Sequence, residues 1–326
     1  MTKPSRDRRD PTEVTVERVP WHDTYARVST AGTTGDRAFV LVPGIGVSSN
    51  YFERLALQLN EFGPVHALDL PGFGGVPHPK GDPMTIKDYA ELVGRVIDEL
   101  GLTDPVIVGH SMGTQIVAEL ASGRDLTDLV LISPVVNPRE RRVRTAALRF
   151  VQSSLHEPPK VAALAIYAYL LCGVRWFYRV LPSMMRYPIE DTLPRITANT
   201  LVITGERDAL CPTPWAKEIA QLLPQAQVWR IPGAAHSVMH ANAEDVARLC
   251  VHHVRREEPD DDVLRMARHA TEDEPEPDLK GQIKAVRGRA TELVGILTDD
   301  DETMAAGKTA HAETAQDAAE SSHASD

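Results

Sequence analysis

The chain has 326 residues, 42% of them apolar, with 21 glycines and 24 prolines. This composition fits one large domain or two ordinary ones and excludes collagen-like and low-complexity classes, while three scattered cysteines are too few for a disulfide framework or a structural zinc site. Residues 257–326 carry 19 of the 46 acidic and 7 of the 35 basic residues, so the other 256 residues hold 27 acidic and 28 basic groups and give no electrostatic reason to expect nucleic acid as a partner.

The N-terminal segment, residues 1–12, is polar and is expected to be disordered. No apolar run follows it, so we expect no secretory signal. No uninterrupted apolar stretch reaches the roughly 18 residues of a spanning helix, which argues against stable membrane insertion. The expected compartment is therefore the cytoplasm.

From residue 13 onward, β-type runs alternate with helical patterns. Strands are expected at 14–19, 25–29, 38–42, 65–69, 106–108, 129–132, 200–203 and 227–231. Helices are expected at 50–61, 85–100, 112–122, 213–223 and 243–255. The first two strands suit an antiparallel pair, and the regular alternation of the rest predicts an α/β fold: a mostly parallel, eight-stranded sheet with helices on both faces. Its core is expected to comprise residues 13–136 and 196–256.

Residues 137–195 interrupt this alternation, because they contain no strand pattern and hold 7 of the 17 aromatic residues. An insertion at the end of a sheet strand is well placed to be a helical lid. Within it, the charge-free segment 161–174 predicts a buried lid helix, with contact at a membrane surface as the alternative. Five arginines open the insertion and are expected either to be solvated or to meet an anionic substrate tail: Arg139, Arg141, Arg142, Arg144 and Arg149.

Residues 257–326 form an acidic tail that we expect to be mostly disordered. Apolar residues spaced by three and four predict one helix within it, at 279–298. The stretch 280–308, with glycines at 281, 288, 295 and 307, resembles a small bacterial stress-protein module, the CsbD-like family. The alternative is a weakly amphipathic, solvated helix.

The strand at 106–108 is followed by Gly-His-Ser-Met-Gly at 109–113 and then by a helix, which is a G-x-S-x-G pattern in a strand–turn–helix context. A serine at such a sharp turn projects its hydroxyl above the sheet, and flanking glycines avoid a collision with neighbouring backbone. The start of the helix presents N–H groups to developing negative charge. The pattern predicts that Ser111 is a nucleophile.

A nucleophilic serine needs a base, and the base needs an acid that orients it. Asp208 follows the strand at 200–203, and His236 follows the strand at 227–231. We therefore expect His236 to act as general base and acid, with Asp208 as the orienting acid. The alternative acid is Glu206 and the alternative base is His240. Four further histidines are interpreted as structural: His22, His66, His78 and His110.

The same chemistry needs two backbone N–H groups directed at the tetrahedral oxygen. Met112, directly after the predicted nucleophile, is one expected donor. Ile45, in the loop Pro-Gly-Ile-Gly at 43–46, is the other. The alternative interpretation of that loop is a plain glycine–proline turn.

These motifs, together with Asp-Leu-Pro-Gly-Phe-Gly at 69–74, resemble the α/β-hydrolase superfamily over roughly residues 20–256. The resemblance implies an α/β-hydrolase fold with a Ser111–His236–Asp208 triad. Position 43 is proline where the family often has histidine, and Ser111 excludes members with an aspartate nucleophile, such as epoxide hydrolases and haloalkane dehalogenases. Among serine members, the chain is similar to lidded carboxylesterases, cofactor-free haloperoxidases and meta-cleavage C–C hydrolases.

The sequence thus predicts a serine hydrolase that cleaves an ester, thioester or lactone of a largely apolar acid through an acyl-enzyme. The alternatives are a C–C bond hydrolase or a haloperoxidase-like enzyme with the same triad, and a non-catalytic binding protein on the same fold. The motifs imply no metal and no organic cofactor, and the expected partner is a small apolar substrate. The acidic tail is expected to be dispensable for catalysis.

Overall fold

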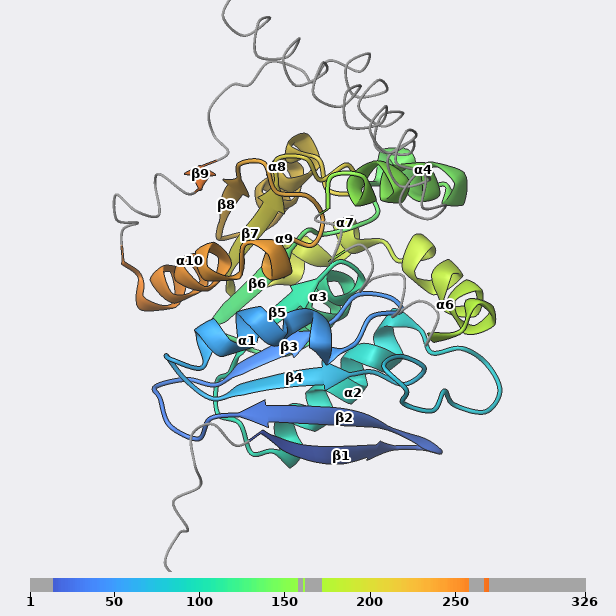
Figure 1. Ribbon diagram of the computed structural model, residues 1–326, viewed down its shortest axis with the longest axis vertical. Coiled ribbons are helices and arrows are strands. Elements are labelled where there is room, and N and C mark those ends of the chain that lie inside the picture. The colour runs from blue at the N-terminus through green and yellow to red at the C-terminus, as the bar shows by residue number, and fades with distance from the viewer. Residues whose placement is uncertain (1–13, 158–160, 162–171, 258–266, 270–326) are drawn as a thin grey trace, which may run out of the picture. The chain divides into compact units, whose positions relative to one another are not determined.

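The computed structural model describes residues 14–157, 161, 172–257 and 267–269 (Figure 1). Three sequence predictions lie outside the described residues: the disordered segment 1–12, the buried lid helix in most of 161–174, and the helix at 279–298 with nearly all of the acidic tail.

One sheet of nine strands runs through the described chain, in the order β1-β2-β4-β3-β5-β6-β7-β8-β9. The strands are β1 (Thr15–Trp21), β2 (Thr24–Ala31), β3 (Phe39–Val42), β4 (Val65–Asp69), β5 (Val106–His110), β6 (Asp128–Ile132), β7 (Asn199–Gly205), β8 (Ala226–Ile231) and β9 (Arg268–His269). β1 and β2 pair antiparallel, β2 joins β4 antiparallel, and β3 to β8 are parallel. The predicted mostly parallel sheet is confirmed, and the two-residue β9 adds an antiparallel edge to the eight expected strands.

Helices cover both faces of this sheet (Figure 1). One face packs against α2 (Ile86–Glu99), α3 (Met112–Gly123) and α8 (Thr213–Leu222), and the other against α1 (Glu53–Leu59) and α10 (Ala243–Arg255). Neighbouring strand residues join opposite cores, as Val40 and Leu41 do in β3. Because successive side chains of a strand point to opposite faces, a strand covered on both sides is apolar throughout, which explains the continuous apolar runs.

Helix α2 illustrates how local sequence determines where an element begins. The side chain of Thr85 accepts a hydrogen bond from Asp88 N, and the carboxylate of Asp88 accepts one from Thr85 N at 2.7 Å. This reciprocal capping box satisfies two backbone donors that the first helical turn leaves unpaired.

The insertion between β6 and β7 is helical in its described part. It contains η2 (Pro138–Glu140), α4 (Val143–Ser154), α6 (Val174–Arg186), α7 (Ile189–Thr192) and η3 (Leu193–Arg195), with no strand among the described residues of 137–195. Helices α4 and α6 lie beside the sheet edge at which the parallel strands end (Figure 1). Every helix in the described ranges is too short or too polar to reach across a lipid bilayer.

Candidate active site

Ser111 lies at the junction of β5 and α3, with φ 55° and ψ −121°. This left-handed backbone is unusual for a residue with a side chain and is typical of strained functional turns. A β carbon at Gly113 would lie 2.2 Å from Val42 O, and one at Gly109 would lie 2.6 Å from Gly113 O. The chain can therefore make this turn only with glycine at both positions, as the motif predicts.

Asp208 and His236 come from the loops after β7 and β8, and they are in direct contact. His236 Nδ1 lies 2.9 Å from Asp208 Oδ2. The other carboxylate oxygen, Asp208 Oδ1, accepts hydrogen bonds from Leu210 N at 2.9 Å and Cys211 N at 3.1 Å. The loop thus holds one oxygen and leaves the second directed at the imidazole.

The two alternative residues have other partners. Glu206 Oε2 accepts a hydrogen bond from Gly233 N at 2.6 Å, so this carboxylate holds the turn after β8. The ring of His240 lies against Tyr51, with 5.9 Å between ring centroids and His240 Nδ1 3.3 Å from Tyr51 O. The geometry therefore pairs Asp208 with His236.

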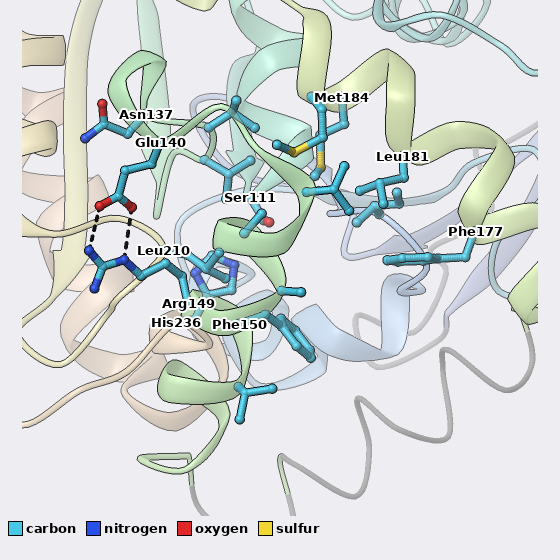
Figure 2. Close-up of a pocket in the computed structure, with 18 of the residues that line it drawn as sticks. Ser111, Asn137, Glu140, Arg149, Phe150, Phe177, Leu181, Met184, Leu210 and His236 are labelled. Carbon is cyan, nitrogen blue, oxygen red and sulfur yellow. Dashed lines mark hydrogen bonds and ion pairs between the residues drawn. The ribbon is translucent and has the colours of Figure 1, made fainter. Parts of the chain in front are cut away.

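Ser111 and His236 both line one pocket, and Figure 2 labels their side chains there. Among the described residues no hydrogen bond joins Ser111 Oγ to the imidazole. The backbone of His236 is hydrogen-bonded to a neighbouring ring: His110 Nε2 donates to the carbonyl oxygen of His236 at 3.1 Å. Burial lowers the pKa of His110 to about 3, so this ring is neutral and serves as a support.

The charges of the Asp208–His236 pair stabilise each other. Burial would raise the pKa of Asp208, but the adjacent imidazole, as a cation and a hydrogen-bond donor, holds that pKa below its ordinary value. Burial likewise favours the neutral form of His236, but the charge of Asp208 and the hydrogen bond to it outweigh burial and raise the pKa of His236. The imidazolium that forms when a serine is deprotonated would thus be stabilised here.

The loop after β3 comes close to the predicted nucleophile. A β carbon on Gly44 would lie 3.0 Å from Ser111 Cβ, and Ile45 lines the pocket. Asp69, at the end of β4, fixes the end of this loop by accepting a hydrogen bond from Ser49 N at 2.6 Å. The same carboxylate also accepts one from Arg27 Nε at 2.7 Å. This buried carboxylate explains why the motif at 69–74 begins with aspartate.

The pocket has a volume of about 400 Å³, within the usual range for small-molecule sites. Figure 2 shows Phe177, Leu181 and Met184 of α6 on one side of Ser111 and the Glu140–Arg149 ion pair on the other. Arg149 donates from Nε and Nη2 to Glu140 at 2.9 and 2.5 Å. The walls are thus largely apolar with one compensated charge pair.

Two other arginines of the insertion are also ion-paired: Arg139 with Glu218 and Arg141 with Glu190.

Several residues near the site carry no local sequence signal. Val136, after β6, lines the pocket with φ 68°, a strained value for a β-branched residue. Ser153 and Glu157, in and after α4, make hydrogen bonds to the loops of Asp208 and His236. Their sequence distances of 55 and 80 residues from those partners explain why no motif contains them. The described ranges hold no cluster of three metal-ligating side chains.

Comparison with known proteins matches residues 39–249 to the alpha/beta hydrolase family, and the chain belongs to that family. The chain is 26% identical over 227 residues to the biotin biosynthesis bifunctional protein BioHC of Cellvibrio japonicus, covering 61% of this chain and 44% of that protein. It is 33% identical over 97 residues to a pimeloyl-acyl-carrier-protein methyl ester esterase of Pseudoalteromonas atlantica, covering 29% and 36%. The chain thus spans less than half the length of each of these two relatives.

Among solved structures, a thermophilic esterase from Thermogutta terrifontis superimposes with a TM-score of 0.63. The superposition covers 75% of this chain and 99% of the esterase, at 22% sequence identity. At this identity the likeness shows the fold alone.

Proposed function

We propose that the chain is a serine hydrolase that cleaves an ester, thioester or lactone of a largely apolar acid through an acyl-enzyme. The proposal is carried by the 2.9 Å contact between Asp208 Oδ2 and His236 Nδ1, together with the strained backbone of Ser111, which lines the same pocket as His236. Membership of the hydrolase family and the esterase name of one relative support it.

In the proposed reaction, Ser111 Oγ attacks the substrate carbonyl carbon and passes its proton to His236 Nε2. Asp208 stabilises the imidazolium. The N–H groups of Ile45 and Met112 bind the developing oxyanion; Met112 is the first residue of α3, so its N–H has no partner inside the helix. His236 then protonates the leaving group. Water, deprotonated by His236, attacks the acyl-enzyme, and the resulting imidazolium returns the proton to Ser111 Oγ as the acid leaves.

The insertion is proposed to be the lid of this site. Helices α4 and α6 supply apolar pocket residues, among them Phe150, Phe177 and Leu181. An acyl chain beside them would be removed from water, at about 25 cal/mol for each Å² of apolar surface buried. The pocket therefore favours an apolar acid.

The charge of the pocket favours a neutral ester over a C–C hydrolase substrate. A C–C hydrolase of this kind takes the product of meta-cleavage as its substrate. That substrate carries a carboxylate, and burying its charge is costly unless a cation in the site pairs with it. Among the described residues lining the pocket, Arg149 is the sole lysine or arginine, and Glu140 neutralises it. A carboxylate bound there would compete with Glu140 for its partner.

A fluorophosphonate probe tests the proposal, because it labels an activated serine. We expect labelling of Ser111, hydrolysis of nitrophenyl butyrate, and loss of both in Ser111→Ala. The matched control is Ser122→Ala, whose Oγ donates to the backbone oxygen of Glu119 within α3 and which should retain both. A folded wild type that is neither labelled nor active would favour the binding-protein alternative, and faster turnover of a ring-cleavage product would favour C–C hydrolysis.

A further inference from the structure

Residues 153–157 of the insertion, at the end of α4 and just after it, contact both loops that carry Asp208 and His236. Helix α4 ends at Ser154, and a turn containing Glu157 follows. Ser153 is 1% exposed and Glu157 is 6% exposed. Burying polar side chains to this degree costs free energy unless they are hydrogen-bonded. The hydrogen-bond partners of Ser153 and Glu157 must therefore compensate for the burial of these two side chains.

Ser153 is hydrogen-bonded twice to the loop of Asp208. Its Oγ donates to Asp208 Oδ1 at 3.2 Å and accepts from Ala209 N at 2.9 Å. A serine hydroxyl has one donor and two acceptor sites, so this one side chain can donate to the carboxylate and accept from the backbone N–H at the same time. The contact adds a third donor to the carboxylate oxygen that does not face His236.

Glu157 makes the corresponding contact to the loop of His236. Its Oε1 accepts a hydrogen bond from Ser237 N, one residue after His236, at 2.6 Å. The same serine is held from the other side, because Ser237 Oγ lies 2.9 Å from the hydroxyl of Tyr51. Glu157 Oε2 is buried without a hydrogen-bond partner among the described residues.

We propose that Ser153 and Glu157 are positioning residues for the reaction. Ser153 fixes the rotamer of Asp208, and Glu157, as a carboxylate, fixes the loop of His236 and stabilises the imidazolium. This inference rests on the hydrolase function proposed above. It means that the insertion completes the catalytic framework in addition to covering the pocket.

The electrostatic part depends on the groups around His236. Asp208 faces its Nδ1, the neutral His110 lies behind it with ring centroids 5.0 Å apart, and Tyr51 lies beyond Ser237. Burial raises the pKa of Glu157, and the positive charge of His236 opposes this effect. In return, the negative charge of Glu157 raises the pKa of His236. Removing that charge must lower the pKa of His236.

Two substitutions at Glu157 separate the hydrogen bond from the charge. In Glu157→Gln the side-chain oxygen still accepts from Ser237 N, so kcat at the pH optimum should stay within a few-fold of wild type. The acid limb of kcat/KM should move to lower pH by roughly 0.5, because one nearby charge is lost. Glu157→Ala loses both effects, and kcat should fall about 10-fold to 100-fold with little change in KM.

Ser153→Ala tests the contact to Asp208 and has a matched control one residue away. We expect a lower kcat in Ser153→Ala and wild-type kcat in Ser154→Ala, whose Oγ donates to the backbone oxygen of Phe150 within α4. Thermal unfolding of each variant verifies that it is folded, and fluorophosphonate labelling of wild-type Ser111 verifies the hydrolase function separately. If wild type is labelled, an unchanged acid limb in Glu157→Gln overturns the role of the charge. Unchanged kcat in folded Glu157→Ala and Ser153→Ala overturns the positioning role.

Discussion

The turn at Ser111 leaves no space for a β carbon at Gly113. At Gly113 the closest backbone atom to an added β carbon is Val42 O, which belongs to a strand of the central sheet and cannot rotate away. A flexible side chain could yield at such a distance, but a paired strand cannot move without losing ladder hydrogen bonds. The second glycine of the motif is therefore a requirement of packing as well as of turn geometry.

We expect Gly113→Ala to destabilise the fold by at least the roughly 1–3 kcal/mol typical of overpacking. Gly123→Ala is the matched control at the other end of α3, where an added β carbon meets nothing within 4 Å. That variant should unfold at the wild-type temperature or slightly above it. Thermal unfolding followed by circular dichroism measures both, and equal melting temperatures for the two variants would contradict the steric argument.

In the proposed mechanism, the pair His236–Asp208 sets the pH dependence of activity. A general base must be neutral, and the pKa of His236 is raised above its ordinary value of about 6.5. Activity should therefore be lost as pH falls through a midpoint above that value. In Asp208→Asn the stabilising charge is gone, so the midpoint should move down and kcat should drop by about 10⁴. Rate profiles, with NMR titration of His236 where rates are too low, measure both; a wild-type midpoint at or below about 6.5 would refute the coupling.

At the scale of elements, the short strand β9 protects a sheet edge. It pairs Arg268 with Arg230 and His269 with Trp229, and the preceding Ala267 is buried in the core formed with α1 and α10. An exposed edge strand can pair with another chain through its free N–H and C=O groups, so even a two-residue strand reduces this risk by covering part of the edge of β8. This element falls inside residues 257–326, the acidic tail expected to be mostly disordered.

Two truncations separate β9 from the rest of the acidic tail. A chain that ends at residue 271 should keep wild-type stability, whereas one that ends at residue 257 loses β9 and should be less stable by roughly 1 kcal/mol, the net value of one or two hydrogen bonds. Both should hydrolyse the same esters with unchanged kcat/KM, because β9 lies outside the described pocket lining. An inactive but folded chain ending at 271 would show that the tail takes part in catalysis.

At the scale of the whole molecule, one buried carboxylate joins distant parts of the chain. Asp128, at the start of β6, is fully buried and forms ion pairs with Arg37, before β3, and with Arg256, after α10. Its Oδ1 also lies 3.6 Å from His253 Nε2. The network thus connects the amino-terminal side of the sheet to the last helix of the core, far from the carboxyl-terminal edge that carries the pocket.

Asp128→Ala should destabilise the protein by about 3 kcal/mol, because it removes the fully buried partner of the largely buried Arg37 guanidinium and leaves that cation paired with the exposed carboxylate of Asp104. Glu99→Ala breaks a pair with Arg95 in which both side chains are about half exposed, and it should cost about 0.5 kcal/mol or less. Urea unfolding compares the two. Similar losses would contradict the role of burial, and kcat/KM per folded molecule should be unchanged in both.

Local patterns were sufficient for the eight expected strands, for the helices that cover the sheet, and for proposing Ser111, Asp208 and His236 as candidate residues. Strand and helix periodicities depend on which side chains must be buried, and the glycines at 109 and 113 follow from backbone sterics within a few residues. The order of alternating strands and helices then predicts the parallel sheet. The parallel arrangement brings Ser111, Asp208 and His236 to one edge, because parallel strands end on the same side.

The pairings within the site were decided by tertiary structure. Asp208 is the expected acid in sequence and Glu206 the alternative; the structure directs Glu206 at Gly233 N and Asp208 at His236. Ser153 and Glu157 reach the site from an insertion whose path over the sheet no local spacing encodes. Hydrogen bonds between residues dozens of positions apart depend on the three-dimensional course of two loops at once, whereas a turn or a strand depends on its immediate neighbours.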